Sequence, residues 1–424
     1  MEGKTISAAI IGSGSRGSNF GDLMQKTEGK FKITAVCDID PEQLTKTKNM
    51  LNLSDDILFD DEEEFFKEKR AEVLVIATPD KLHVRQSIRA MHMGYDILVE
   101  KPLTDSEEEL KALLKAKEET NRTVVVCHEL RYAPAFVKLS ELLEEGVVGD
   151  LLAIDAMERL VYWHQAQAYV RLQSQYFDLA YPTIFAKCSH DLDLIQHYAG
   201  AECDTVSSIG GLSFFRKENA PQGAAERCLD CPYVEKCPYS AKKIYIDNFI
   251  KDGRPEWVWP YNKVSLKKPL KEEDIYEGLR TKCFGKCVFM CGVEKDEHVV
   301  DHQMVQMNFK NGVIATLKMV FSGAAGRRYN FFGTRGEILM DDRNGTIEVF
   351  RYGEEKEVIS VDSLIEAGYS HGGGDQILID RLYSILNNEC ENRTSLRESA
   401  ESHLMGIAAE KSRLSGGKAV KINR

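Results

Sequence analysis

The stretch Asp96-Ile97-Leu98-Val99-Glu100-Lys101-Pro102 determines how the rest of the chain is interpreted. Ile97 to Val99 is a short apolar run rich in β-branched residues, which is typical of a buried parallel strand. Pro102 has no N–H to donate to a sheet, so the strand is predicted to end before it. Ligands of doubly wound α/β sheets bind at the carboxyl ends of the strands. We therefore expect Lys101 to face a binding site, with Glu100 beside it.

A glycine-rich turn near the start of the chain supports the same fold. Ile6 to Ile11 is apolar and leads into Gly12-Ser13-Gly14-Ser15-Arg16-Gly17 and then a helical pattern. This is Gly-x-Gly-x-x-Gly between a strand and a helix, the context that a dinucleotide-binding turn requires. Gly12 permits the tight turn, Gly14 lets the backbone approach a pyrophosphate, and Gly17 lets the helix and strand pack closely. The phosphates are expected at the helix N-terminus, where N–H groups and the helix dipole favour anions.

An acidic residue after the second predicted strand indicates which dinucleotide is bound. The strand Ile33 to Cys37 ends at Asp38. A carboxylate in this place accepts hydrogen bonds from the adenosine ribose hydroxyls and repels a 2′-phosphate. Asp38 therefore favours NAD over NADP, and Asp40 strengthens that preference.

Strands and helices alternate through the first 130 or so residues. After the second strand, the pattern predicts further strands at 73–76, 97–99 and 123–127 and helices at 41–51, 61–70 and 106–120. Alternation at this spacing predicts a right-handed parallel sheet.

Length, charge and cysteine count limit the class of protein. The chain has 424 residues, enough for two or three domains. Its formal net charge of -12 argues against a nucleic-acid partner. It shows no signal-peptide pattern and no long apolar run, so we expect a cytoplasmic protein without a membrane span. An odd count of 11 cysteines favours reduced thiols over a disulfide framework.

The motifs of the first 130 or so residues, in their order along the chain, resemble the Gfo/Idh/MocA family of glucose–fructose oxidoreductase and inositol 2-dehydrogenase. The resemblance is looser beyond them. It implies an NAD-binding Rossmann domain at 1–130 and an α+β domain at 131–424 with an open, mostly antiparallel sheet, substrate lying between the two. The motifs that carry the resemblance are Gly12-x-Gly14-x-x-Gly17, Asp38, Ala77-Thr78-Pro79, His83 and Glu100-Lys101-Pro102. The expected cofactor contacts are Gly12, Gly14, Ser15, Arg16, Gly17, Asp38, Ala77, Thr78, Pro79, His83, Glu100, Lys101 and His128.

A second catalytic stretch surrounds His190. The family usually has an aspartate four residues before a histidine that is followed by Asp-x-Asp; here that histidine is His190 and the aspartate position is Ala186. Lys187 lies three residues before His190, so both face the same side if the segment is helical. Asp193 and His197 offer a second Asp-x-x-x-His register, although the Asp-x-Asp context favours His190.

The second domain shows strand patterns and several candidate substrate contacts. Residues 299–309 and 313–321 are predicted to form a hairpin around Asn311-Gly312. The helix predicted at 376–386 follows Asp375, which is expected to cap it. A last helix is predicted to run to Leu414 from a capping box of Ser395 and Glu398. Two polar and aromatic clusters, at 162–164 and 169–171, are expected in a loop, where they suit a sugar or ordinary surface packing equally well. The candidate substrate contacts are Arg131, Tyr132, Trp163, His164, Tyr169, Arg171, His302 and His371.

A cysteine-containing insertion is expected at about 218–297. Cys228-x-x-Cys231 has metal-ligand spacing, and Cys237-Pro238 follows it. These three cysteines with Cys287 or Cys291 are predicted to bind either structural zinc or an iron–sulfur cluster. Free thiols packed as small apolar groups are the alternative.

Three functions remain open on the sequence. The first is an NAD-dependent oxidoreductase of a sugar, cyclitol or related polyol, in which His190 is the base, Lys101 binds the reacting oxygen and Lys187 shares that role. The second is a glycoside hydrolase that uses transient NAD-dependent oxidation and elimination. The third is a dinucleotide-sensing regulator, against which the presence of Lys101 and His190 argues. The family resemblance also implies a homodimer or homotetramer, because an open sheet needs its second face covered.

Overall fold

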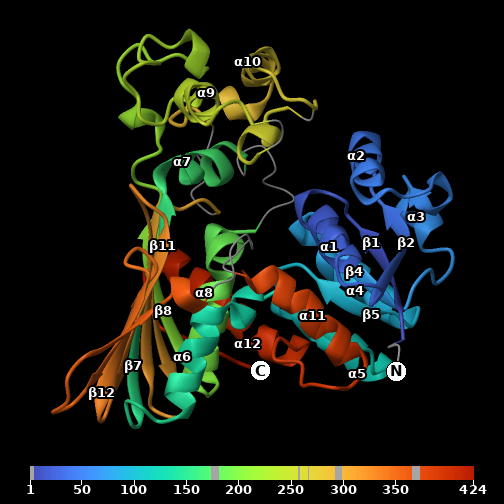
Figure 1. Ribbon diagram of the computed structural model, residues 1–424. Coiled ribbons are helices and arrows are strands. Elements are labelled where there is room, and N and C mark those ends of the chain that lie inside the picture. Colours follow the sequence, from blue (N-terminus) through green and yellow to red (C-terminus); the bar gives the residue numbers. More distant parts are fainter. Residues whose placement is uncertain (1–3, 173–180, 256–257, 266, 292–297, 365–372) are drawn as a thin grey trace.

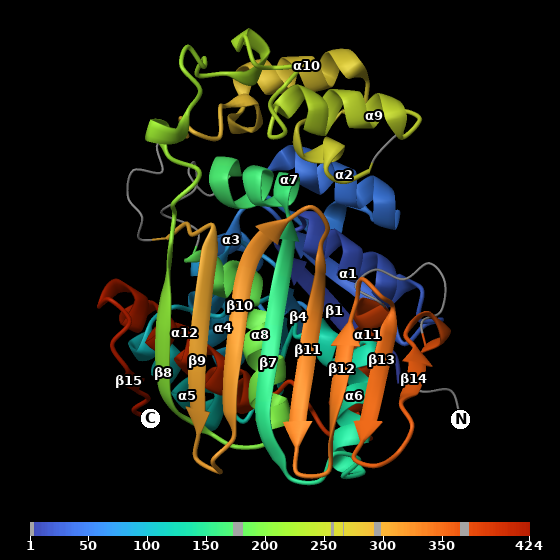
Figure 2. The same cartoon turned by 90° about the vertical axis from the view of Figure 1, so that its left-hand side faces the viewer.

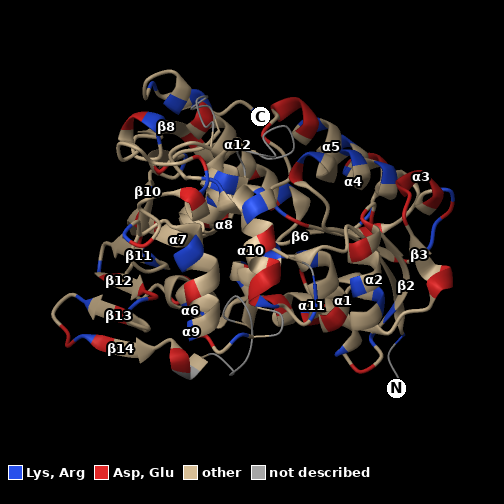
Figure 3. Ribbon diagram, turned by 90° about the horizontal axis from the view of Figure 1, so that it is seen from above, with Lys and Arg blue, Asp and Glu red and all other residues tan. Residues whose placement is uncertain are grey.

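Two β-sheets, with helices packed between and around them, organise the chain (Figure 1). The computed structural model describes residues 4–172, 181–255, 258–265, 267–291, 298–364 and 373–424. Seen from above, basic and acidic residues are interspersed over the helices (Figure 3).

The first sheet is parallel and confirms the predicted doubly wound α/β fold. Its strands lie in the order β3 (Leu58–Phe59), β2 (Phe31–Cys37), β1 (Ile6–Ile11), β4 (Val73–Ile76), β5 (Asp96–Val99) and β6 (Val124–Val126). The connecting helices are α1 (Ser15–Gln25), α2 (Pro41–Leu51), α3 (Glu62–Phe65), α4 (His83–His92) and α5 (Glu107–Thr120). All four residues of β4 are buried, as expected of a central parallel strand that is covered on both faces.

A helix from the end of the chain completes this first layer. In α11 (Gly374–Leu386), Leu378, Ile379 and Leu382 are fully buried and share one apolar cluster with residues of β1 and β2. Asp375 does not cap α11, contrary to the prediction. The N-cap position is Gly373, and the Asp375 carboxylate instead binds a guanidinium of the first domain. The parallel sheet therefore depends on residues that lie some 370 positions beyond its first strand.

The second sheet is mostly antiparallel, as predicted. Its strands lie in the order β14 (Glu357–Ser360), β13 (Thr346–Arg351), β12 (Gly336–Asp341), β11 (Gly326–Gly333), β7 (Leu151–Val161), β10 (Ile314–Ser322), β9 (His302–Phe309), β8 (Cys203–Gly211) and β15 (Val420–Lys421). Of these neighbours β7 and β10 pair in parallel, and the others pair antiparallel. The predicted hairpin joins β9 to β10, with Gly312 at a φ of 91° in its turn.

The two faces of the second sheet differ. The inner face packs on helices, whereas no described element covers the outer face (Figure 2). The helices behind the sheet are α6 (Pro134–Glu144), α8 (Thr183–Ala199) and α12 (Leu396–Leu414). In α12, Ser395 and Glu398 form the predicted capping box, which satisfies backbone N–H groups at the helix start.

The predicted loop after β7 is helical, contrary to expectation. β7 runs into α7 (Tyr162–His164) and then into the π-helical segment η4 (Gln165–Leu172). Tyr169, Val170 and Arg171 are buried there, so tertiary packing under the cysteine-containing insertion overrides the polar character of the segment. The insertion has its own apolar cluster and lies beyond one end of the second sheet (Figure 1).

The insertion and the connections contain short helical elements. Those of the insertion with α or π geometry are η7 (Lys242–Asp247), α9 (Asn248–Lys251) and α10 (Glu272–Thr281). The short 3-10 turns are η1 (Asp55–Ile57), η2 (Asp80–Leu82), η3 (Glu129–Tyr132), η5 (Lys217–Asn219), η6 (Cys228–Asp230), η8 (Tyr261–Lys263), η9 (Cys283–Gly285) and η10 (Asp362–Leu364). Within the described ranges, no helix combines the length and apolar character needed to cross a bilayer.

Candidate active site

A cavity of about 330 Å³ lies where the carboxyl ends of β4 and β5 face α8 and η4. This volume is within the range of small-molecule sites, roughly 300–1,000 Å³. Its lining residues are Arg16, Ala77, Thr78, Asp80, His83, Glu100, Lys101, Glu129, Leu130, His164, Tyr169, Ala186, Lys187, His190 and Arg327. The cavity thus joins residues of the parallel sheet to residues of the second part of the chain.

The glycine-rich turn beside this cavity has the shape that a pyrophosphate requires. Gly12 has a φ of 85°, and a Cβ there would lie 2.6 Å from backbone atoms of Ala77. A Cβ on Gly17 would lie 2.0 Å from the Gly12 carbonyl oxygen, so α1 and β1 pack too closely for a side chain. A Cβ on Gly14 would meet nothing within 4 Å. The backbone at Gly14 is therefore open to a ligand, at the N-terminus of α1, which has no side-chain cap.

Asp38 lies at the end of β2, next to this turn. The backbone N of Ser13 donates to Asp38 Oδ2 at 2.7 Å, and the Ser13 hydroxyl lies 3.1 Å from the same oxygen. Asp40 acts differently, because its carboxylate caps α2 by accepting from the backbone N of Glu42 at 2.9 Å. The structure thus ties Asp38 to the glycine turn and uses Asp40 for local helix capping.

Arg16 connects the turn to α11. Its guanidinium binds Glu100 and, through both terminal nitrogens, the Asp375 carboxylate at 3.0 and 2.9 Å. Burial opposes the charged form, but the Glu100 and Asp375 carboxylates outweigh it and raise the pKa of Arg16. The Arg16 guanidinium, which was expected to contact the cofactor, is therefore paired with two carboxylates.

Two buried histidines hold the segment that follows Lys101. The ring nitrogens of His83 lie 2.8 Å from the Pro102 carbonyl oxygen and 2.9 Å from that of Thr78. On α12, His403 Nε2 accepts from the backbone N of Leu103 at 2.8 Å. This segment is fixed from both sides, and Lys101 Nζ reaches the cavity, where it lies 3.4 Å from the Ala186 carbonyl oxygen.

His190 projects from α8 into the same cavity. Its Nε2 lies 3.3 Å from Glu129 Oε1, and its Nδ1 is buried without a hydrogen-bond partner among the described residues. Burial, with a smaller contribution from the Lys101 charge, lowers the pKa of His190 to about 4, although Glu129 opposes this. The imidazole is consequently neutral at physiological pH and can accept a proton.

Lys187 belongs to a buried network on the inner face of the second sheet. Its Nζ lies 2.9 Å from Glu158 Oε1 on β7, and Arg327 Nε of β11 lies 3.0 Å from Glu158 Oε2. The same Arg327 binds both oxygens of Asp191, and the Tyr329 hydroxyl donates to Asp191 at 2.8 Å. Burial raises the pKa of Glu158, an effect that Arg327 and Lys187 oppose.

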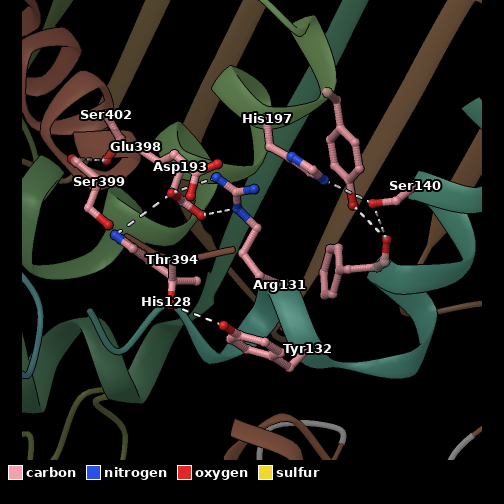
Figure 4. A network of polar contacts seen from close by, with 12 residues as sticks. His128, Arg131, Tyr132, Ser140, Asp193, His197, Thr394, Glu398, Ser399 and Ser402 are labelled. Atoms are coloured by element: carbon pink, nitrogen blue, oxygen red, sulfur yellow. Dashed lines mark hydrogen bonds and ion pairs between the residues drawn. The ribbon is translucent and has the colours of Figure 1, made fainter. Parts of the chain in front are cut away.

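The next acid of the Asp-x-Asp motif holds α8 on its other side (Figure 4). Asp193 accepts from Arg131 Nε at 2.6 Å and from Nη2 at 3.1 Å, and both side chains are buried. Burial by itself raises the pKa of Asp193, but Arg131 and His128 outweigh it and lower this pKa to about 2. His197 lies 3.1 Å from the Ser140 hydroxyl and does not line the cavity. Between the two possible registers, the structure therefore places His190 in the cavity.

Several predicted site residues lie away from the cavity because other contacts hold them. His128 and Arg131 are buried against Asp193, and the Tyr132 hydroxyl lies 3.2 Å from Thr394 Oγ1. Arg171 is fully buried under the insertion, where Lys286 and Tyr239 carbonyls accept its N–H groups. Two further predicted substrate contacts, Trp163 and His302, are outside the cavity lining: Trp163 packs on Trp259, and His302 Nδ1 lies 2.7 Å from Asp301 Oδ1. His371 lies outside the described residues.

Three charged residues of the cavity were not predicted. Asp80 follows the Ala-Thr-Pro motif directly, and Glu129 follows His128, so their neighbourhood in sequence was a signal for both. Burial raises the pKa of Asp80, and His83 and Lys101 oppose this. Arg327 has no such signal, because only the pairing of β11 with β7 brings it over α8.

Comparisons with known proteins agree with this architecture. A profile of an oxidoreductase family with an NAD-binding Rossmann fold matches residues 6–128, and a profile of that family's C-terminal α/β domain matches residues 267–422. The YteT protein of Bacillus subtilis is 22% identical over 414 residues, which cover 91% of this chain and 89% of YteT. An inositol 2-dehydrogenase/D-chiro-inositol 3-dehydrogenase of Lactiplantibacillus plantarum is 25% identical over 155 residues, 36% of this chain and 44% of that protein. The solved structure of levoglucosan dehydrogenase with NADH and L-sorbose has a TM-score of 0.71 at 17% identity, covers 100% of both chains and shows a shared fold.

The Asp193–Arg131 pair yields a stability prediction. Asp193→Asn should lower the free energy of unfolding by about 3–5 kcal/mol at pH 7, because it leaves a buried guanidinium without its counter-charge. The pKa of Asp193 is lowered from its ordinary value of 3.8 to about 2. The ion pair therefore stabilises the folded state fully above pH 3.8, and this stabilisation is lost as the pH falls through 2. Denaturant titrations followed by circular dichroism at pH 7 measure the difference.

Asp22→Asn is the matched control, because Asp22 pairs with Lys26 on the surface of α1. Its effect should stay below about 1 kcal/mol. Equal losses from the two variants would contradict the importance assigned to the buried pair.

Proposed function

The chain belongs to the Gfo/Idh/MocA family of NAD-binding oxidoreductases, and on that basis we propose that it transfers a hydride between NAD and a CH–OH carbon of a sugar, cyclitol or related polyol. The observation that carries the proposal is that Lys101 and His190, which come from separate parts of the fold, line one cavity beside the glycine turn. NAD, when bound, supplies a nicotinamide ring that exchanges a hydride with a substrate carbon.

The residues at the glycine turn fit NAD. Gly14 and the uncapped start of α1 are suited to hold the pyrophosphate, because backbone N–H groups there have no side-chain acceptor. Asp38, at the end of β2, is placed to accept from the adenosine ribose hydroxyls. Its carboxylate repels a 2′-phosphate, which supports NAD over NADP.

Lys101 is assigned to the reacting oxygen of the substrate. Its ammonium group stabilises negative charge that develops there as the hydroxyl loses its proton, and a buried cavity makes this stabilisation stronger than in water. The contacts of His83 and His403 with the following segment restrict the positions open to Lys101. The charge is therefore held in place before the substrate enters.

His190 is assigned to the proton of the substrate hydroxyl. If Nε2 donates its hydrogen to Glu129, the lone pair is on Nδ1, the buried nitrogen without a described partner. Glu129 then orients the imidazole and stabilises the positive charge that forms after proton transfer. The low pKa of about 4 keeps His190 in the neutral form that this role requires.

Lys187 supplies a second positive charge at the cavity. Ala186 leaves no carboxylate at the place where the family usually has an aspartate, and Lys187 is the next residue of α8. Its ion pair with Glu158 fixes the ammonium group at the cavity wall. We assign it to substrate binding beside Lys101.

The polar lining of the cavity supports a hydroxyl-rich substrate. Asp80 and Glu129 accept hydrogen bonds, Lys187 and Arg327 donate them, and Tyr169 adds an aromatic face. The names of two relatives, an inositol dehydrogenase and a levoglucosan dehydrogenase, support the same class.

The proposed roles of Lys101 and His190 predict a loss of turnover. Lys101→Ala and His190→Ala should each reduce kcat by about a hundred- to ten-thousand-fold, the usual loss for an acid–base group. Lys187→Ala should also lower the rate, whereas NAD binding should persist in all three because the glycine turn is unchanged. Initial rates of NADH formation on a panel of polyols, sugars and cyclitols measure the effect, and calorimetry measures NAD binding.

Lys111→Ala, an exposed change on α5, is the control and should keep wild-type turnover. A parallel panel of aryl glycosides tests the glycosidase alternative. Release of the aglycone without net NADH formation would contradict net hydride transfer, and full activity in both Lys101→Ala and Lys187→Ala would refute the assigned mechanism.

The position of Asp38 predicts that the protein binds NAD in preference to NADP. Calorimetric titration should show tighter binding of NAD than of NADP, and Asp38→Ala should reduce that preference by removing the ribose acceptor and the repulsion of the 2′-phosphate. Asp40→Ala is the control, because the Asp40 carboxylate caps α2. Tighter binding of NADP by the unaltered protein would refute the role of Asp38.

The outer face of the second sheet supports a homodimer or homotetramer. Ile209, Ile314 and Phe332 lie on three different strands of this face and are 61%, 57% and 37% exposed. Because no described element covers them, a second copy is the partner that the family resemblance implies.

Light scattering should therefore show a dimer or tetramer at micromolar concentration. Ile314→Arg should shift the protein towards monomer, because it puts a charge into an apolar interface. Met50→Arg, at an exposed apolar position on α2, should leave the mass unchanged. A monomeric wild-type protein would contradict the assembly.

A further inference from the structure

Four cysteines of the insertion meet at one small hollow that is separate from the catalytic cavity. Cys228, Cys231, Cys237 and Cys287 line a space of about 20 Å³. The other residues of the lining are Pro221, Ala224, Tyr233, Val234, Tyr239, Ser240, Val288 and Phe289. This lining contains neither a carboxylate nor an imidazole, so sulfur is its only strong metal ligand.

Backbone pairing brings the two cysteine segments together across more than fifty residues of sequence. The backbone N of Cys287 donates to the Glu226 carbonyl at 2.8 Å, and Arg227 forms an isolated β-bridge with Lys286. On the first segment, turns direct Cys231 and Cys237 to the same hollow, since Cys231 N donates to the Cys228 carbonyl at 3.2 Å. The convergence is thus part of the main-chain structure.

Arg171 provides a buried positive charge beside these sulfurs. Its Nη2 lies 3.5 Å from Cys228 Sγ, and the same nitrogen donates to the Tyr239 carbonyl at 2.7 Å. Its Nε donates to the Lys286 carbonyl at 2.8 Å, next to Cys287. The side chain is fully buried. A positive charge in this place would stabilise thiolates bound to a metal centre.

The arrangement of the sulfurs favours a cluster over a single ion. Among the described residues, no three His, Cys, Asp or Glu side chains are positioned to hold one metal ion. The four cysteines instead surround a hollow, as ligands of a multi-iron centre do. We propose that Cys228, Cys231, Cys237 and Cys287 hold an iron–sulfur cluster of the [4Fe–4S] class, with one cysteine thiolate on each iron.

The structure also separates these four cysteines from their neighbours in sequence. Cys291 does not line the hollow, and its Sγ lies 3.1 Å from the Cys287 carbonyl oxygen. Cys283 is likewise outside the lining. Between the two alternatives for the fourth ligand, the geometry therefore selects Cys287.

The position of the cluster indicates a structural role. The segment η4 carries Tyr169, which lines the catalytic cavity, and two residues later Arg171, which lies against Cys228. A cluster that fixes the insertion through Arg171 also fixes this side of the cavity. The cluster is nevertheless independent of the proposed function, because its ligands take no part in hydride transfer.

Metal and sulfide analysis of the full-length protein, purified without oxygen and without chelator, tests the proposal. We expect about four irons and four acid-labile sulfides per chain, with broad visible absorption that dithionite bleaches. Cys231→Ser and Cys287→Ser should lose most of the iron, whereas Cys283→Ala should keep it. Circular dichroism shows whether each variant is folded.

Thiol counting on the unaltered protein covers the case in which the variants do not fold. Four more cysteines should react with a thiol reagent after iron is removed by chelator and oxidant than before. Absence of iron and sulfide, even after reconstitution with iron and sulfide under reducing conditions, would overturn the proposal. One equivalent of zinc in place of iron, or equal iron in the Cys283 and Cys287 variants, would overturn it as well. Each of these results leaves the test of hydride transfer unaffected.

Discussion

Two buried ion pairs on α8 are the constraint on which the catalytic cavity depends. Asp191 pairs with Arg327 of the second sheet, and Asp193 pairs with Arg131 of the crossover from the first domain. Residues two apart on a helix point in different directions, so the two acids fasten α8 to two different parts of the protein. His190 precedes Asp191 and is thereby given a fixed orientation. The Asp-x-Asp motif is thus understood as a clamp that positions its neighbouring histidine.

The opposite wall of the cavity is built on the same principle. Lys101 leaves the end of β5, and histidines from α4 and α12 hold the residues that follow it. Arg16 joins the glycine turn to Glu100 and to Asp375 of α11. Because each wall is fixed by elements distant in sequence, the lysine and the histidine approach each other without either lying on a long unsupported loop. Such preorganisation is what electrostatic stabilisation of a reacting oxygen requires.

Much of the first domain could be predicted because its signals are local. A buried parallel strand is a short apolar run, and the dinucleotide turn has a fixed glycine spacing, so β4 and α2 were predicted with the bounds that the structure shows. The hairpin at Asn311-Gly312 and the capping box at Ser395 are equally local. The helical state of η4 was not predictable in this way, since burial under the insertion overrides its polar and aromatic residues.

The sequence by itself determined the two sheets and the glycine turn, and it proposed Lys101, Lys187 and His190 as the groups for the chemistry. Their roles could be proposed because charge and proton affinity are properties of the side chain. Only the tertiary structure decided which other charged groups reach the cavity. Arg131 and Arg171 looked like ligand contacts, yet a buried carboxylate holds the first and backbone carbonyl groups hold the second. Arg327 and Glu129 enter the cavity instead, because pairing between distant segments, which no local pattern records, determines which side chains lie together.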